Sequence, residues 1–210
     1  MSFKVDNSPA ADSMSIRALL ERSLQEHLDA IQNLLRTRIN EIEEAGEMIC
    51  EALSNGHKIL LCGNGGSAAD AQHIAAELVG KYEMERPGLP AVALTTDTSA
   101  LTALSNDYGY KEVFARQVRA LASTGDVLIA ISTSGGSANV IEAVKAAKNR
   151  GCKTIALIGA TPGVLDSCGD VVVSVPSSRT SRVQEAHITI GHLWCEMVDT
   201  RIKFGVEPSP

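Results

Sequence analysis

Apolar side chains recur at every third or fourth position between Ile16 and Leu35, which places them along one face of a helix. A second helix is predicted over about 38–53, because Asn55 and Gly56 follow it and such residues commonly end helices. Together the two helices form a predicted N-terminal helical arm over about 14–54. We expect the apolar stripe of this arm both to cover the rest of the fold and to meet another subunit.

Beyond Gly56, short apolar runs alternate with helical stretches. The predicted strands are residues 58–62, 90–95, 126–132, 153–158 and 171–175. The predicted helices lie near 67–82, 111–121, 137–150 and 182–204. Such alternation indicates the α/β class, with a parallel sheet and helices on both of its faces. This core is expected over about 57–206, and the whole chain (1–210) is predicted to be a single domain.

The order of the strands follows from their number and type. The third and fourth runs are apolar over most of their length, as in strands buried on both faces of a parallel sheet. Five such strands most often take the flavodoxin-like order 2-1-3-4-5, in which strands 1 and 3 are neighbours. Ligands of open sheets bind at the carboxyl ends of the strands, where the connections diverge. The site is therefore expected after strands 1 and 3.

Composition narrows the class of function. Hydrophobic residues make up 44% of the 210, so a substantial core is possible, and the net charge of −6 argues against broad nucleic-acid binding. No apolar run approaches the roughly 20 residues of a membrane span. The N-terminus has no apolar stretch typical of a signal peptide, and five widely spaced cysteines indicate buried free thiols. We therefore expect a cytoplasmic protein that binds neither nucleic acid nor membrane.

Two loops follow the first and third predicted strands, and both contain residue types that bind phosphate. The first is Cys62-Gly63-Asn64-Gly65-Gly66-Ser67, and the second is Ser132-Thr133-Ser134-Gly135-Gly136-Ser137. Glycines let the backbone approach an anion, hydroxyls donate to it, and the N-terminus of the next helix adds N–H groups and a favourable dipole. The second loop, with four hydroxyls in six residues, is the stronger candidate. It suits a single sugar phosphate better than a triphosphate.

Two other interpretations of these loops remain open. Gly63, Gly65 and Ala68 fit a loose dinucleotide-binding pattern, and Asp97 could bind a ribose, but a nicotinamide cofactor leaves the second loop unexplained. Both loops could also be tight turns without a ligand. A Walker phosphate loop is excluded, since neither loop contains Gly-Lys-Ser/Thr.

Polar residues gather on two predicted helices. His73 and Glu77 are four residues apart and share a face, with Gln72 beside them. The last helix carries Gln184, Glu185, His187 and His192, and Gln184 and His192 are about two turns apart. Imidazole and carboxylate at such spacing can bind a divalent metal such as zinc. From spacing alone, however, a His–Glu pair of this kind is more often a solvated surface pair.

The longer motifs resemble a known family. The run from Cys62 to His73 with Glu77 beyond it is similar to the sugar isomerase (SIS) domain of the phosphoheptose isomerases. The same resemblance extends to 94–97, 106–109, 132–139, 182–185 and His192, and covers about residues 15–204. The chain departs from the family pattern at Gly136, where many relatives have Asn, and in the segment 159–163.

The resemblance implies an enzyme that converts sedoheptulose 7-phosphate to D-glycero-D-manno-heptose 7-phosphate through an enediol(ate). This aldose–ketose isomerisation is the first step of ADP-heptose biosynthesis for the lipopolysaccharide core. The family implies a homotetramer with one zinc ion (Zn2+) per subunit, bound by His73, Glu77, Gln184 and His192. Glu77 and His192 would be catalytic. Substrate contacts would come from Asn64, Gly65, Gly66, Ser67, Glu77, Asn106, Asp107, Ser132, Thr133, Ser134, Ser137 and Gln184.

Two alternatives belong to other classes of function. One relative of the family is a non-enzymatic tetrameric SIS protein that binds the replication initiator, and it lacks the glutamate at the position of Glu77. A regulatory SIS domain would sense a sugar phosphate without converting it, and would not need Glu77 and His192 together. The presence of both residues here favours the enzyme.

Overall fold

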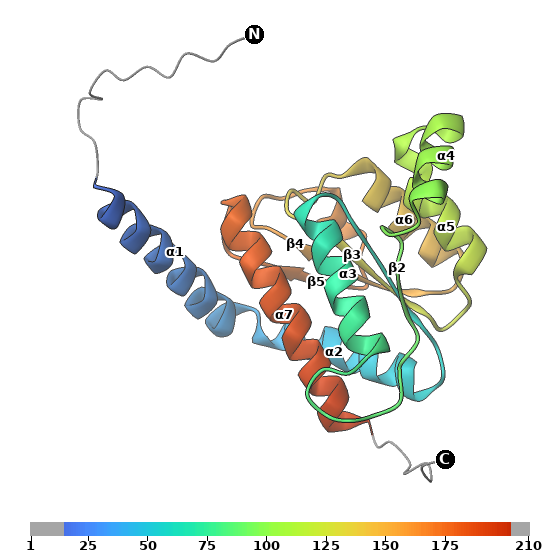
Figure 1. Ribbon diagram of the computed structural model, residues 1–210, viewed down its shortest axis with the longest axis horizontal. Coiled ribbons are helices and arrows are strands. Elements are labelled where there is room, and N and C mark those ends of the chain that lie inside the picture. The colour runs from blue at the N-terminus through green and yellow to red at the C-terminus, as the bar shows by residue number, and fades with distance from the viewer. Residues whose placement is uncertain (1–14, 203–210) are drawn as a thin grey trace.

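A five-stranded parallel sheet forms the centre of the computed structural model, which describes residues 15–202 (Figure 1). The strand order β2-β1-β3-β4-β5 confirms the predicted order. The strands are β1 (Ile59–Gly63), β2 (Ala91–Ala93), β3 (Val127–Ser132), β4 (Lys153–Ile158) and β5 (Val171–Ser174). In the central pair, Ile59 lies opposite Val127 and Gly63 lies opposite Ile131, so β1 and β3 end side by side.

Side chains of the central strands alternate between two hydrophobic clusters, one on each face of the sheet. Ile59 and Leu61 of β1 enter one cluster, whereas Leu60 and Cys62 enter the other. Every residue of β1 and β3 is buried. This burial explains why their sequences read as continuous apolar runs and not as alternating ones.

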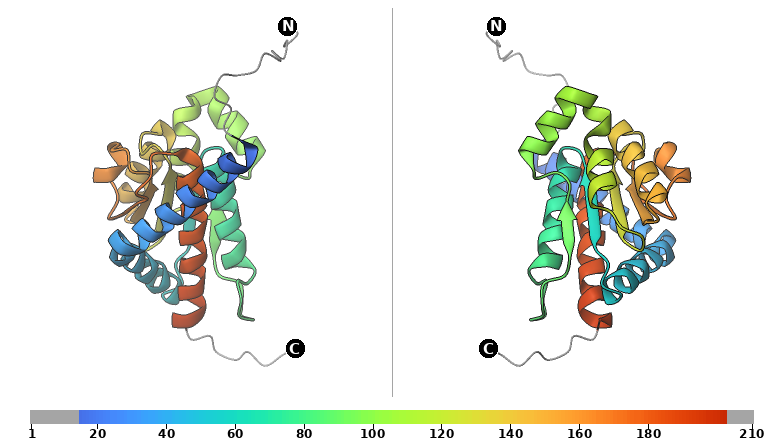
Figure 2. Two further views of the ribbon diagram at one scale, coloured as in Figure 1. Left: turned by 90° about the vertical axis from the view of Figure 1, so that its left-hand side faces the viewer. Right: turned by 90° about the vertical axis from the view of Figure 1, so that its right-hand side faces the viewer.

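Helices cover both faces, as predicted. The first cluster packs against α2 (Ile39–Ser54), α3 (Gly66–Val79) and α7 (Thr180–Arg201), and Figures 1 and 2 show α3 and α7 side by side. The second cluster packs against α5 (Val113–Leu121) and α6 (Ala138–Asn149). The fully buried Trp194 joins α7 to α2, since its indole N–H donates to the Ile42 carbonyl at 3.0 Å.

The helical arm covers the core only in part. Helix α1 (Ile16–Thr37) buries Ala30 and Leu34 and projects beyond the sheet (Figure 1). Most of its apolar stripe is exposed: Leu20, Leu24, Leu28 and Leu35 are each more than half exposed, at 58%, 67%, 52% and 62%. Of the two helices of the arm, α2 packs on the sheet, whereas the end of α1 packs against α2 and α7.

Several boundaries differ from the predictions. Helix α4 (Thr98–Tyr108) and the short helices η1 (Tyr110–Glu112) and η2 (Val164–Ser167) were not predicted. Helix α4 has no fully buried residue, and only Leu101 and Leu104 pack against the second cluster, so its apolar pattern is too short to reveal it. Asp97 caps α4 by accepting from the Ala100 N–H at 2.9 Å. Strand β2 is shorter than predicted because a turn begins at Leu94, and α3 ends earlier because Gly80 follows it.

The remaining sequence expectations concern thiols and membranes. Cys50, Cys62, Cys152 and Cys195 are buried free thiols and Cys168 is partly exposed, which confirms the absence of a disulfide framework among the described residues. Over residues 15–202, no helix combines the length and apolar character that crossing a bilayer requires. The outer ends of the predicted arm and core, at residue 14 and beyond 202, lie outside the described residues.

Candidate functional site

The first glycine loop joins β1 to α3 in a space that excludes side chains. Gly65 has a φ of +56°, a conformation that favours glycine. A Cβ at Gly63 would lie 2.6 Å from the Ser67 carbonyl oxygen, and one at Gly66 would collide with the side-chain amide of Gln184. The loop thus brings the N-terminus of α3 directly against α7, with Gln184 beside Gly66.

The second loop joins β3 to α6 and gathers hydroxyl groups. The Ser132 and Ser137 hydroxyls lie 2.9 Å apart, and the Gly136 N–H donates to the Ser134 hydroxyl at 3.3 Å. Gly135 has a φ of +63°, and its carbonyl accepts from the Leu165 N–H at 3.0 Å. The segment around η2 therefore supports this loop, whose hydroxyls lie at the start of α6 where an anion would be stabilised.

A reciprocal amide pair ties the two loops together. Asn64 donates to Asn139 at 2.9 Å, Asn139 donates back at 2.8 Å, and the Tyr110 hydroxyl donates to the Asn64 side-chain oxygen at 3.1 Å. The predicted role of Asn64 was a substrate contact, and in this structure its side chain joins the two loops. Asn139 and Tyr110 were not predicted as site residues. The available signal for Asn139 was a polar side chain in line with the apolar Ala143 and Ala146 on one face of the predicted helix.

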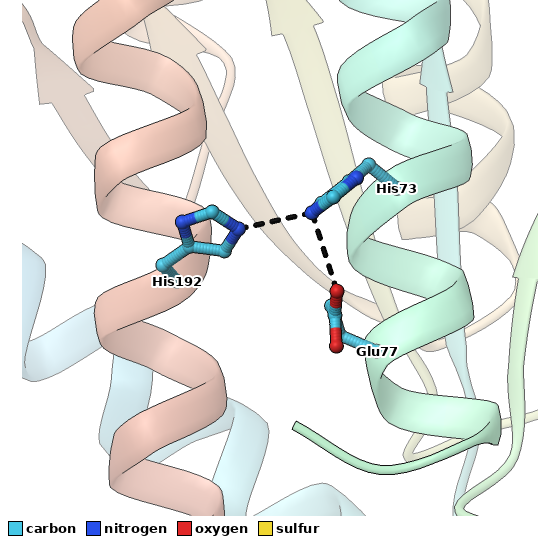
Figure 3. A group of neighbouring side chains, drawn as sticks. All are labelled: His73, Glu77 and His192. Atoms are coloured by element: carbon cyan, nitrogen blue, oxygen red, sulfur yellow. Dashed lines mark hydrogen bonds and ion pairs between the residues drawn. The ribbon is translucent and has the colours of Figure 1, made fainter. Parts of the chain in front are cut away.

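Three of the four predicted metal ligands meet between α3 and α7 (Figure 3). His73 Nε2 lies 3.0 Å from His192 Nε2 and 3.3 Å from a carboxylate oxygen of Glu77. One donor atom from each of the three residues lies within 4.8 Å of the others. Two imidazole nitrogens and a carboxylate oxygen at this separation fit a divalent metal such as zinc. Gln184 lies near the start of α3, beside Gly66, and its role as a fourth ligand stays a prediction.

Two further residues border this cluster and were not predicted. The Tyr82 ring stacks on the His192 imidazole, with ring centroids 5.6 Å apart and planes at 30°. Asp70 lies one turn before His73, and one of its oxygens is buried without a hydrogen-bond partner among the described residues. Burial raises the pKa of Asp70 to about 6, against a smaller lowering by His73.

Other polar residues predicted near the site lie elsewhere or are otherwise engaged. His187 is fully buried and faces β4, where its Nε2 lies 3.2 Å from the Ile158 carbonyl. Glu185 pairs with His27 of α1 at 2.7 Å. Asn106 and Asp107 lie on the last turn of α4, exposed and hydrogen-bonded to each other at 2.9 Å.

The distance between the glycine loops and the His73–Glu77–His192 cluster suits an extended ligand. His73 lies seven residues beyond Gly66 on α3, which is about 10 Å along the helix axis. A ligand whose phosphate rests at the loops could therefore extend along α3 and place its other end at the cluster. This arrangement can bind an anion at one end and move protons or hold a metal at the other.

Comparison with known proteins identifies the family. Residues 23–159 match the SIS domain model. The phosphoheptose isomerase of Aliarcobacter butzleri is 56% identical over 176 residues, which cover 84% of this chain and 93% of that protein. The phosphoheptose isomerase of Nitratiruptor sp. is 55% identical over 86% of this chain and 96% of its own length.

Solved structures agree with this result. The structure of phosphoheptose isomerase from Neisseria gonorrhoeae has a TM-score of 0.84 and 48% identity, and the match covers 89% of this chain and 100% of that one. The structure of a phosphoheptose isomerase from Francisella tularensis has a TM-score of 0.87 and 37% identity over 90% and 100%. The chain therefore belongs to the phosphoheptose isomerase family of SIS-domain proteins.

Proposed function

We propose that this protein is an aldose–ketose isomerase that converts sedoheptulose 7-phosphate to D-glycero-D-manno-heptose 7-phosphate. The observation that carries the proposal is the His73–Glu77–His192 cluster, which lies on the helix that begins at the first glycine loop and on its neighbour α7. The relatives described above bear the name of this activity. Together they favour an enzyme over a module that only binds a sugar phosphate.

The phosphate of the substrate would rest at the second loop. Ser132, Thr133, Ser134 and Ser137 supply hydroxyls, and α6 supplies N–H groups and the positive end of its dipole. Ser67 and the backbone of Gly65 and Gly66 would complete the anion site from the first loop. Asn106 and Asp107, at the exposed end of α4, are proposed to contact the sugar hydroxyls.

The proton transfers would take place at the other end of the substrate. Moving a carbonyl from C2 to C1 requires a base that removes a proton from one carbon and returns it to its neighbour. The Glu77 carboxylate is proposed for this role, and His192 for the transfer between the two oxygens. Tyr82 restricts the orientation of the His192 ring by stacking on it.

His73, Glu77 and His192, with Gln184 as the proposed fourth ligand, would hold one zinc ion per subunit. When bound, such an ion supplies Lewis-acid stabilisation of the negative charge that develops on the substrate oxygens. The carboxylate of Glu77 has two oxygens, which allows one residue to serve both as ligand and as base.

The cellular setting is also part of the proposal. The product would enter ADP-heptose synthesis for lipopolysaccharide in the cytoplasm. The exposed leucines of α1 favour burial against other copies of the chain, in agreement with a homotetramer. Light scattering of the purified protein measures this oligomeric state directly.

The activity is tested by incubating the purified protein with sedoheptulose 7-phosphate and measuring the aldose formed. We expect Glu77→Gln and His192→Gln each to lower kcat at least a hundredfold while inhibition by inorganic phosphate persists. Glu85→Gln is the matched control, because Glu85 is exposed and pairs only with Lys81 at 2.6 Å in the described contacts. Near-normal kcat in Glu77→Gln would refute the assignment.

The non-enzymatic alternative, a protein that binds the replication initiator, is not supported by the relatives, which are named as isomerases. A pull-down with the initiator protein, in parallel with the isomerase assay, separates the two. Binding without conversion of sedoheptulose 7-phosphate would favour the alternative.

A further inference from the structure

A buried arginine binds the backbone carbonyls at the C-terminal end of α3. The Arg86 side chain is fully buried, and its guanidinium donates to the carbonyls of Glu77 at 2.9 Å and Leu78 at 2.9 Å. These carbonyls belong to the last turn of the helix, where no further helical N–H is available to pair with them. Arg86 therefore holds the backbone of Glu77, one of the three residues of the cluster.

The same guanidinium is fixed to α7 by a carboxylate. Arg86 Nε donates to Asp199 at 2.7 Å, and only 5% of the Asp199 side chain is exposed. The other Asp199 oxygen accepts from the backbone N–H groups of Glu83 at 3.1 Å and Met84 at 3.0 Å. Asp199 thus binds both the arginine and the segment that connects α3 to β2.

Asp199 lies on the side of α7 that carries His192. The two residues are seven positions apart, which is close to two full helical turns, so they project in nearly the same direction. Tyr82, whose ring stacks on His192, directly precedes the two N–H groups that Asp199 holds. Arg86 therefore contacts the backbone of Glu77 directly. Asp199 is connected to His192 by helix α7, which carries both residues, and by the segment next to Tyr82.

We propose that Arg86 and Asp199 are positioning residues that set the separation of α3 and α7 and so the geometry of the His73–Glu77–His192 cluster. The inference rests on the proposed role of that cluster in metal binding and proton transfer. Ligands on two different helices bind one ion tightly only when the helices are held at the right distance. Residues that orient ligands without touching the metal typically contribute 10–100-fold to metal affinity.

A second buried ion pair in the same chain provides the matched control. Asp126 is 2% exposed at its side chain and accepts from the Lys58 ammonium at 2.6 Å and from the N–H groups of Lys58 at 3.0 Å and Ser123 at 2.7 Å. Its burial and number of bonds resemble those of Asp199, but these partners belong to neither α3 nor α7. Asp126→Asn therefore reproduces the loss of a buried carboxylate charge without touching the cluster.

The experiment compares Asp199→Asn with Asp126→Asn in the full chain. Cobalt(II) is titrated into each metal-free protein and followed by its absorbance, with zinc as competitor, and kcat and KM for sedoheptulose 7-phosphate are measured after zinc loading. We expect Asp199→Asn to weaken metal binding at least tenfold and lower kcat with little change in KM. Asp126→Asn should keep metal affinity and kcat within twofold, whatever it loses in melting temperature.

A conservative variant guards against simple unfolding. Arg86→Lys keeps the positive charge but cannot donate to Asp199, Glu77 and Leu78 together. It should fold and still weaken metal binding several-fold. If either Asp199→Asn or Arg86→Lys has the metal affinity and kcat of the wild type, the positioning role is overturned. It is also overturned if Asp126→Asn loses as much metal affinity and kcat as Asp199→Asn does.

The outcome also separates this inference from the proposed function. If the wild-type protein binds no cobalt or zinc, the metal assignment fails. The positioning inference is then decided by kcat, which Asp199→Asn should lower and Asp126→Asn should not. If the wild type binds metal but has no isomerase activity, metal affinity decides it.

Discussion

His187 should make the fold sensitive to mild acid. It is fully buried on α7, its Nε2 lies 3.2 Å from the Ile158 carbonyl, and its Nδ1 has no hydrogen-bond partner within residues 15–202. Burial lowers the pKa of this imidazole to about 4, against a smaller raising by the bond to Ile158. The unfolded chain, with an ordinary histidine pKa near 6.5, therefore takes up protons that the folded chain resists.

The sign and size of the effect follow from this difference. A lowered folded-state pKa means that the stability contribution is present above pH 6.5 and is lost as the pH falls toward 4. Lowering the pH from 7 to 5 should remove about 2 kcal/mol of unfolding free energy through this residue, and about 3 kcal/mol should be gone by pH 4. His187→Gln does not titrate in this range, and its amide can still donate to Ile158.

The assay is urea unfolding of wild type and His187→Gln at pH 7, 6 and 5 and at one protein concentration. Other groups titrate in both proteins, so the difference between the two curves isolates His187. Wild type should lose about 2 kcal/mol more than the variant between pH 7 and pH 5. Parallel pH dependence of the two proteins would refute the reasoning, as would a His187 proton resonance that titrates near pH 6.5.

Other predictions concern the two loops. Asn139→Ala removes the tie between the loops and leaves the side-chain N–H of the partly buried Asn64 without its partner, while the Asn64 oxygen keeps its bond to Tyr110. The variant should cost about 1–3 kcal/mol by urea unfolding and raise KM, whereas Asn149→Ala, on the exposed end of α6, should do neither. Ser137→Ala should weaken inhibition by inorganic phosphate several-fold in a kinetic assay, and an unchanged inhibition constant would argue against phosphate at this loop. Gly163→Ala should raise KM, because its Cβ would lie 2.6 Å from the Gly135 carbonyl carbon; a crystal structure with an undisturbed loop would contradict this.

The sequence revealed the sheet and its order because both depend on local patterns and general rules of connection. The runs of β3 and β4 are apolar over most of their length, and alternation with helices limits the topology to a few choices. Helix α4 escaped prediction because only Leu101 and Leu104 pack against the core, and two positions are too few for a periodic signal. The two glycine loops could be predicted because glycine shapes a turn by its own backbone conformation, which does not depend on distant contacts.

What the sequence alone determined was the class of fold, the two loops, and the pair His73 and Glu77 on one helix face. Tertiary structure decided which distant side chains meet. It brought to that pair His192, which the family resemblance but no local pattern had placed there, and it turned His187 into the core. It also engaged Asn64 with Asn139 and joined Arg86 to Asp199. The physical reason is that periodicity records only whether a position faces the interior. Which partner it meets there depends on how α3, α6 and α7 pack on the shared sheet, and that packing is a property of the whole chain.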